Sequence, residues 1–197
     1  MDPFVHDTNP ARIVFGAGKV AALGDEVERL GCSRTLVVCT PGRTAMAEEL
    51  SASLGDKRVA VCAEARMHVP LENAEIGREA ARAHQADSVV SIGGGSAIGL
   101  GKAIALECDI PLICVVTTYS GSEMTAACGM VEGGRKIHYA SPRMRPKAVI
   151  YDAELTVGLP VSTAGPSGFA NTSFATMSWP RSALSPLTSR TAPNSPA

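Results

Sequence analysis

The 197-residue sequence has few aromatic side chains, and its charges almost cancel. Aromatic residues make up 4% of the chain and the formal net charge is -1, so neither the basic face nor the stacking platforms of a nucleic-acid-binding protein are indicated. No apolar run reaches the roughly 18 residues that a membrane span needs. Asp2, Pro3 and Asp7 interrupt any apolar core of a signal peptide. We therefore expect a cytoplasmic protein with no nucleic-acid or membrane partner.

The cysteines and histidines show no metal-binding spacing. Six cysteines are scattered along the chain, mostly in apolar runs, and none forms a CxxC pair. The four histidines form no HxxxH pair. Neither a zinc site nor a disulfide framework is indicated, and we expect buried thiols and no metal ion in this chain.

Short apolar runs alternate with helical patterns through the first 150 residues. The runs predict strands at 13–15, 35–39, 58–63, 87–92, 112–116 and 146–152. This alternation is typical of right-handed crossovers and predicts an α/β fold, with an open Rossmann-like parallel sheet and flanking helices. The segment 128–138 carries Gly133 and Gly134 at its centre and predicts a β-hairpin inserted into this fold.

A glycine-rich turn joins the strand at 87–92 to the following helix. It reads Ser91-Ile-Gly-Gly-Gly-Ser-Ala-Ile-Gly-Leu-Gly-Lys102. Consecutive glycines let the backbone approach a bulky anion, and the helix N-terminus offers free N–H groups with partial positive charge. Gly93–Ser96 is therefore predicted to cradle a pyrophosphate, the alternative being a tight turn without a ligand.

A polar segment, Thr117-Thr-Tyr-Ser-Gly-Ser122, follows the strand at 112–116. Because the carboxyl ends of parallel strands meet at one edge of a sheet, we expect this segment and the glycine turn to face one crevice. A polar loop that only closes the strand is the alternative.

Lys102 is either a solvated helix residue or a direct contact to a cofactor. Glu123 is expected to be structural rather than a general base.

The composition changes after Glu154. No acidic residue occurs from Leu155 to Ala197, and prolines interrupt every later stretch. We expect a Rossmann-like dinucleotide-binding domain over 1–160 and an aberrant or disordered tail over 161–197.

The glycine turn, Val116–Thr125 and Val149–Thr156 occur together in an order and spacing that resembles the iron-containing alcohol dehydrogenase superfamily, and within it the maleylacetate reductases. The superfamily usually carries an aspartate where this chain has Gly99, whereas Lys102 keeps the lysine of its pattern. Gly99, together with Thr117–Glu123, favours the maleylacetate reductase branch. The resemblance covers about residues 10–168.

The resemblance implies reduction of the carbon–carbon double bond of maleylacetate to 3-oxoadipate by NADH or NADPH, in the breakdown of aromatic and chloroaromatic compounds. It implies pyrophosphate contacts from the glycine turn, a crevice lined by the threonines, a lysine at the cofactor ribose and a leucine near the adenosine end. The implied cofactor-binding residues are Gly93, Gly94, Gly95, Ser96, Thr117, Thr118, Ser122, Lys136 and Leu155. No catalytic residue is assigned, and a homodimer is the assembly that the resemblance suggests.

The superfamily also has a second, all-helical domain, which carries the substrate pocket and the metal ligands of its metal-dependent members. This chain departs from that pattern after Gly168, and no histidine follows His138. We expect that domain to be largely absent and the chain to be truncated and weakly active or inactive. The alternatives are a metal-dependent alcohol or polyol dehydrogenase and a non-catalytic nucleotide-binding fragment. No carboxylate ends the strand at 35–39 and Arg43 follows it, so NADH and NADPH both stay open.

Overall fold

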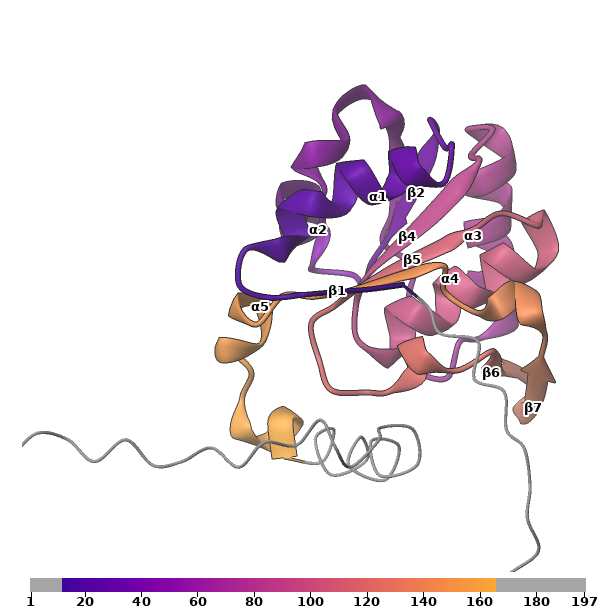
Figure 1. Ribbon diagram of the computed structural model, residues 1–197. Coiled ribbons are helices and arrows are strands. Elements are labelled where there is room, and N and C mark those ends of the chain that lie inside the picture. Colours follow the sequence, from indigo (N-terminus) through magenta and orange to yellow (C-terminus); the bar gives the residue numbers. More distant parts are fainter. Residues whose placement is uncertain (1–11, 166–197) are drawn as a thin grey trace, which may run out of the picture.

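Six short strands form one parallel sheet in a computed structural model that describes residues 12–165 (Figure 1). The strands lie in the order β1-β8-β5-β4-β2-β3, and every neighbouring pair is parallel. Their bounds are Arg12–Phe15 (β1), Thr35–Val38 (β2), Arg58–Cys62 (β3), Ser88–Gly93 (β4), Leu112–Val116 (β5) and Ala148–Tyr151 (β8). The predicted open parallel sheet is confirmed.

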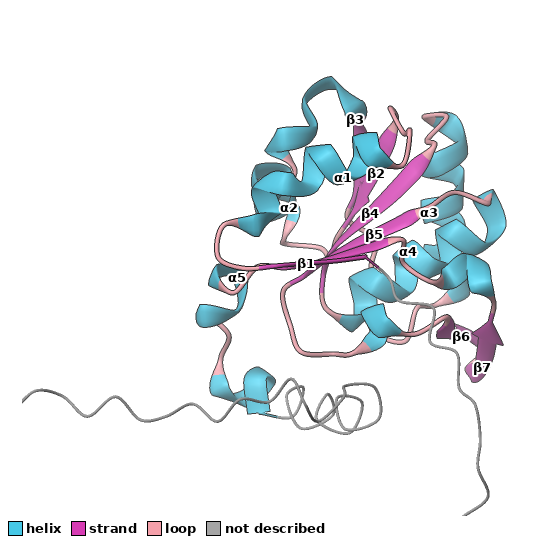
Figure 2. Ribbon diagram, in the orientation of Figure 1, coloured by secondary structure: helices cyan, strands magenta, loops and turns pink. Residues whose placement is uncertain are grey.

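Helices cover both faces of this sheet (Figure 2). The helices α1 (Leu23–Arg29) and α2 (Thr44–Leu50) pack on one face, where Leu23, Val27 and Ala47 contact the strands. The helices α3 (Leu71–Ala83) and α4 (Gly95–Cys108) pack on the other face. Because both faces are covered, every residue of β2, β4 and β5 is buried, and this accounts for their continuous apolar runs.

The strand order reverses between β2 and β4. From β2 the chain moves outward to the edge strand β3, and it then returns across β2 to β4 and onward to β5. In open α/β sheets, ligands bind beyond the carboxyl ends of the strands at such a reversal. The glycine turn directly follows β4, so the topology places it at this point.

The predicted hairpin is present as β6 (Ala127–Glu132) and β7 (Arg135–Ala140), which form a separate two-stranded sheet (Figure 1). Gly133 and Gly134 form its turn with φ values of 54° and 77°, which glycine adopts without steric cost. On its inner side, Cys128 and Met130 pack against Ala103 of α4. The hairpin therefore lies on the α4 side of the sheet.

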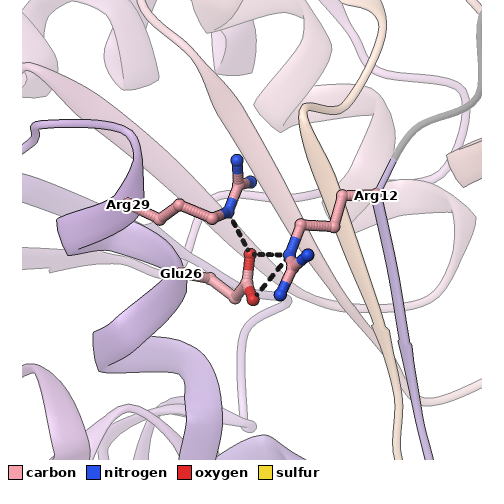
Figure 3. Close-up of polar contacts among 3 residues, drawn as sticks. All are labelled: Arg12, Glu26 and Arg29. Carbon is pink, nitrogen blue, oxygen red and sulfur yellow. Dashed lines mark hydrogen bonds and ion pairs between the residues drawn. The ribbon is translucent and has the colours of Figure 1, made fainter.

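A buried carboxylate joins the edge strand β1 to α1. The side chain of Glu26 is 4% exposed and accepts hydrogen bonds of 2.9 Å from Nε of Arg12 and Nε of Arg29 (Figure 3). Burial alone would raise the pKa of Glu26, but the hydrogen bonds from Arg29 and Arg12 outweigh it and the pKa lies below its usual value.

Short 3₁₀-helices connect several of these elements. The helix α2 ends at Leu50, and the 3₁₀-helix η2 (Ala52–Lys57) follows it, with Gly55 at a φ of 53°. Three shorter 3₁₀-helices are η1 (Lys19–Ala22), η3 (Ser122–Met124) and η4 (Pro142–Met144), and α5 (Glu154–Val157) follows β8. Of the expected tail, residues 166–197 lie outside the described residues.

All six cysteines are free thiols, and only Cys108 is more than slightly exposed. This agrees with the expectation of buried thiols. Within residues 12–165, no helix has both the length and the apolar character that a membrane crossing requires.

Candidate functional site

The turn between β4 and α4 has the geometry that its glycines predict. Gly93 has a φ of 148°, and a Cβ at this position would lie 2.9 Å from the Cβ of Ala97. Gly94 is the N-cap of α4, and no side chain accepts a hydrogen bond from the first turn of this 14-residue helix. The N-terminus of α4 therefore keeps its N–H groups free of a side-chain cap, as anion-binding helix termini do.

The segment after β5 packs directly on this glycine turn. The amide of Thr117 donates a hydrogen bond of 3.1 Å to the carbonyl of Gly93. A Cβ at Gly94 would lie 2.5 Å from Oγ1 of Thr118, so a glycine is needed there for this close approach. The two segments therefore meet, as the parallel sheet requires, while a shared cofactor crevice and the cofactor roles of Gly93, Gly94, Thr117 and Thr118 stay predictions.

Next to this contact, the surface has a hollow of about 350 Å³, here called the α4 hollow. Its walls are the start of α4, the loop before α3, the end of the threonine segment and the hairpin. It is lined by Met67, His68, Val69, Gly95, Ser96, Gly99, Ser122, Ala127, Cys128, Gly129 and Lys136. Of the predicted cofactor-binding residues, Gly95, Ser96, Ser122 and Lys136 are thus brought together.

Lys136 reaches the α4 hollow across the face of the hairpin. It stands on β7, and its Cε lies 2.5 Å from where a Cβ of Gly129 on β6 would be. The absence of a side chain at Gly129 therefore leaves room for the lysine stem. The side chain is exposed, so its ammonium group is available to an anion in the α4 hollow.

Leu155 does not join these residues. It packs against the hydrophobic cluster on the α1–α2 face of the sheet, together with Val20 and Ile150, whereas the α4 hollow lies on the side of α4 and the hairpin. Its predicted place near the adenosine end of a cofactor is not tested by this geometry and stays a prediction.

His68 and Val69 are among the residues of the α4 hollow that the sequence did not predict. Their φ values are 64° and 47°, a left-handed conformation that is unfavourable for a β-branched valine. Val69 is held there because its carbonyl accepts a 3.1 Å hydrogen bond from the amide of Val131, and its side chain fills the space beside Gly99. No local sequence pattern signals this loop, since its partners are more than 25 residues away.

Lys102 is fully buried beneath the α4 hollow, so the expectation of a solvated helix lysine is wrong. Its Nζ donates hydrogen bonds to the carbonyl of Ser122 (2.6 Å), Oγ1 of Thr125 (2.8 Å) and the carbonyl of Ala127 (2.8 Å). These bonds occupy all three protons of the ammonium group, and none is left for a ligand. Burial lowers the pKa of Lys102 from 10.5 to about 8.

Glu123 is also fully buried, on the other side of the same segment. Its carboxylate accepts hydrogen bonds from the hydroxyl of Tyr151 on β8 (2.9 Å) and from Oγ of Ser120 (3.3 Å). Burial, together with the Glu123 charge, raises the pKa of Tyr151 above its usual value, so the hydroxyl stays a donor. Glu123 therefore fixes η3 to the sheet, which is the structural role that the sequence indicated.

Among the residues that the structure describes, the side chains near the α4 hollow form neither a metal centre nor an activated thiol. Over residues 12–165, no three side chains of His, Cys, Asp or Glu gather in a way that could hold a metal ion. Burial raises the pKa of Cys128, which lines the hollow, and raises that of Cys114 to about 12. These thiols are therefore protonated at neutral pH and are poor nucleophiles.

Comparisons with known proteins agree with this geometry. The family model for iron-containing alcohol dehydrogenase matches residues 10–153. A maleylacetate reductase from Rhizobium sp. (strain MTP-10005) is 51% identical over 168 residues, which are 85% of this chain and 48% of that protein. The chain thus spans about half the length of the curated relatives it matches.

Two crystal structures show the same arrangement. The maleylacetate reductase from Agrobacterium tumefaciens superposes with a TM-score of 0.82 at 50% identity, over 85% of this chain and 48% of that one. An iron-containing alcohol dehydrogenase from Corynebacterium glutamicum gives a TM-score of 0.81 at 38% identity, over 86% of this chain and 48% of that one.

Proposed function

The chain belongs to the iron-containing alcohol dehydrogenase family, and from this premise we propose that residues 12–165 are the nucleotide-binding half of an NAD(P)H-dependent maleylacetate reductase. One observation carries the proposal. The α4 hollow joins an uncapped helix N-terminus, a glycine turn and a lysine at the strand-order reversal, in a chain 51% identical to a maleylacetate reductase.

The residues present fit a dinucleotide. The backbone of Gly93–Ser96 would hold the pyrophosphate. The first turn of α4 has no side-chain cap, and the partial positive charge of a helix N-terminus favours a bound anion. Thr117 and Thr118 would line the crevice beside it, and Ser122 and Lys136 would contact the cofactor from the opposite wall of the α4 hollow. Lys136 would add a positive charge for phosphate or ribose oxygens.

Bound NADH or NADPH would supply the hydride for the carbon–carbon double bond of maleylacetate, which its conjugated carbonyl polarises. The described residues contribute binding and orientation of the cofactor, and we assign none of them a role in substrate activation. They also offer no ligand set for iron, so no step is assigned to a metal here. Reduction of maleylacetate to 3-oxoadipate is thus proposed for the whole protein.

The curated relatives support this reaction: two of them, 51% and 44% identical to the chain, are maleylacetate reductases from Rhizobium sp. and Sphingobium indicum. Identity alone does not rank it above alcohol oxidation, because solved structures described as a putative and an iron-containing alcohol dehydrogenase are 46% and 38% identical. A binding fragment without activity predicts the same cofactor contacts and differs only in turnover, so the test measures both.

The test is a titration of the 197-residue chain with NADH and NADPH, followed by nucleotide fluorescence, and then addition of maleylacetate with NADH absorbance as the readout. We expect saturable binding of at least one nucleotide and little or no oxidation by this chain alone. Failure to bind either nucleotide would refute the proposal. Steady NADH oxidation with maleylacetate would assign the reaction to this chain itself, whereas turnover of alcohols instead would favour the alternative.

A further inference from the structure

A fully buried ammonium group lies directly under the α4 hollow, and the proposed cofactor contacts do not use it. Lys102 is 0% exposed and stands on α4, with one wall residue of the α4 hollow, Gly99, one turn before it. Taking a lysine charge out of water is costly, so such a group is retained where it is fully hydrogen-bonded. The acceptors of Lys102 therefore show what its charge holds in place.

All the acceptors lie on one short segment of the chain. The carbonyls of Ser122 and Ala127 and the hydroxyl of Thr125 accept from Nζ at 2.6 to 2.8 Å. Residues 122–127, here called the wall segment, include η3 and lead into the hairpin. Two of these three acceptor residues, Ser122 and Ala127, also line the α4 hollow.

The wall segment is fixed from both sides. Glu123 binds it to β8 through the hydroxyl of Tyr151, while Lys102 binds it to α4. Its backbone lacks a ladder of sheet hydrogen bonds between β5 and β6, because residues 117–126 belong to neither strand. The ammonium group thus replaces the backbone pairing that would otherwise set the position of this wall.

We propose that Lys102 is a positioning residue, which holds the wall segment in the place that lets Ser122 and its neighbours contact the cofactor, without touching the cofactor itself. This inference rests on the proposed cofactor binding. It predicts that loss of the ammonium charge weakens nucleotide affinity although no direct contact is lost.

The titration of Lys102 gives a readout that a purely architectural residue would not give. The titratable groups that face it are Glu123 of η3, Cys114 of β5 and Cys128 of β6. Burial raises the pKa of both thiols, that of Cys114 to about 12, whereas the pKa of Lys102 is lowered to about 8. Above pH 8 the neutral amine donates fewer hydrogen bonds, so nucleotide affinity is expected to fall between pH 7 and about 9.5.

The first variant is Lys102→Met, which keeps an unbranched side chain of similar length and removes the charge. NADH affinity of the full 197-residue chain is measured by fluorescence from pH 7 to about 9.5. We expect at least a tenfold loss of affinity at pH 7 and a flat pH profile, because the titrating group is gone. Lys147→Met is the matched control, since Lys147 is exposed at the opposite end of the sheet and should keep its affinity within twofold.

A milder variant, Thr125→Val, keeps the test decisive if Lys102→Met does not fold. Valine has the shape of threonine but lacks the hydroxyl that accepts a hydrogen bond from Nζ of Lys102. We expect NADH affinity to fall about threefold. In the Lys102→Met background, Thr125→Val should cause no further loss, because the two residues act through one contact.

The outcomes separate this inference from the proposed function. A wild-type chain that binds neither nucleotide overturns both. Two other outcomes overturn the positioning role and leave the proposed function intact. In the first, the wild-type chain binds NADH with an affinity that does not change between pH 7 and 9.5. In the second, the Lys102→Met and Thr125→Val variants fold and bind NADH within twofold of the wild-type affinity.

Discussion

The proposed pyrophosphate site at Gly93–Ser96 can be tested by adding a single methyl group, because Gly94 packs closely against Thr118. In Gly94→Ala the new Cβ would meet Oγ1 of Thr118 at 2.5 Å and its Cγ2 at 2.9 Å, where ordinary contacts begin at 3.4 Å. Gly94 has a φ of -98°, so alanine brings no backbone strain and the whole effect comes from this collision. Overpacking of this kind costs about 1–3 kcal/mol.

Two measurements follow from that figure. The melting temperature should fall by about 2–12 °C, since each kcal/mol is worth about 2–4 °C in a chain of this size. NADH affinity should fall at least tenfold, because the glycine turn and Thr118 are pushed apart at the proposed pyrophosphate site. Gly158→Ala is the matched control: a Cβ there has no neighbour within 4 Å and its φ is -86°.

The double variant Gly94→Ala/Thr118→Ala separates collision from lost binding. Removing Oγ1 and Cγ2 of Thr118 relieves the two shortest contacts and should restore most of the melting temperature. NADH affinity should stay low if the Thr118 side chain lines the crevice. An unchanged melting temperature and affinity in Gly94→Ala itself would refute this account of the cradle.

Two further predictions concern groups away from the α4 hollow. Glu26→Gln should lower the free energy of unfolding by about 1 kcal/mol in urea titrations, a value reduced for solvent screening because its arginine partners are half exposed. Because the pKa of Glu26 is lowered on folding, the unfolded chain takes up its proton first as the pH falls, so the wild type should lose this advantage below about pH 4.5; an equal stability gap at pH 3 and pH 7 would contradict it. Among the cysteines, the half-buried Cys108 should react first with a thiol reagent and Cys114 last, and Cys108→Ser should remove the fast phase.

The sequence predicted those elements whose signals are local. Continuous apolar runs located the buried strands, and at Leu112–Val116 both ends agree with the structure. The glycine turn and the hairpin turn were found for the same reason, because glycine adopts the positive φ values they contain without steric cost. The meeting of the two loops followed from the parallel sheet, which brings the carboxyl ends of β4 and β5 to one edge.

The rest depends on contacts between distant residues. The sequence left Lys102 open between a solvated helix residue and a direct cofactor contact, and neither alternative includes burial. In the structure, α4 is covered by the sheet on one side and by the hairpin and wall segment on the other. The acceptors that make its burial tolerable are 20 to 25 residues further along the chain. Leu155 was grouped with the cofactor residues by family position alone, which does not reveal the face of the sheet on which it packs.

The glycine at position 99 and the strained backbone of Val69 depend on each other. A Cβ at Gly99 would lie 2.5 Å from Cγ2 of Val69 and 3.6 Å from Sγ of Cys128, so any side chain there would enter space that the valine already fills. Val69 reaches that space only by adopting its unfavourable φ of 47°, which the hydrogen bond from Val131 and the packing of the hairpin maintain. The aspartate that the superfamily resemblance implies for this position would be a carboxylate against a valine and a thiol, and its burial there would be costly. The glycine at 99 therefore makes one side of the α4 hollow apolar. The positive groups that line the hollow and could receive an anion are Lys136 and the N-terminus of α4, which are the groups proposed to bind the cofactor from opposite walls.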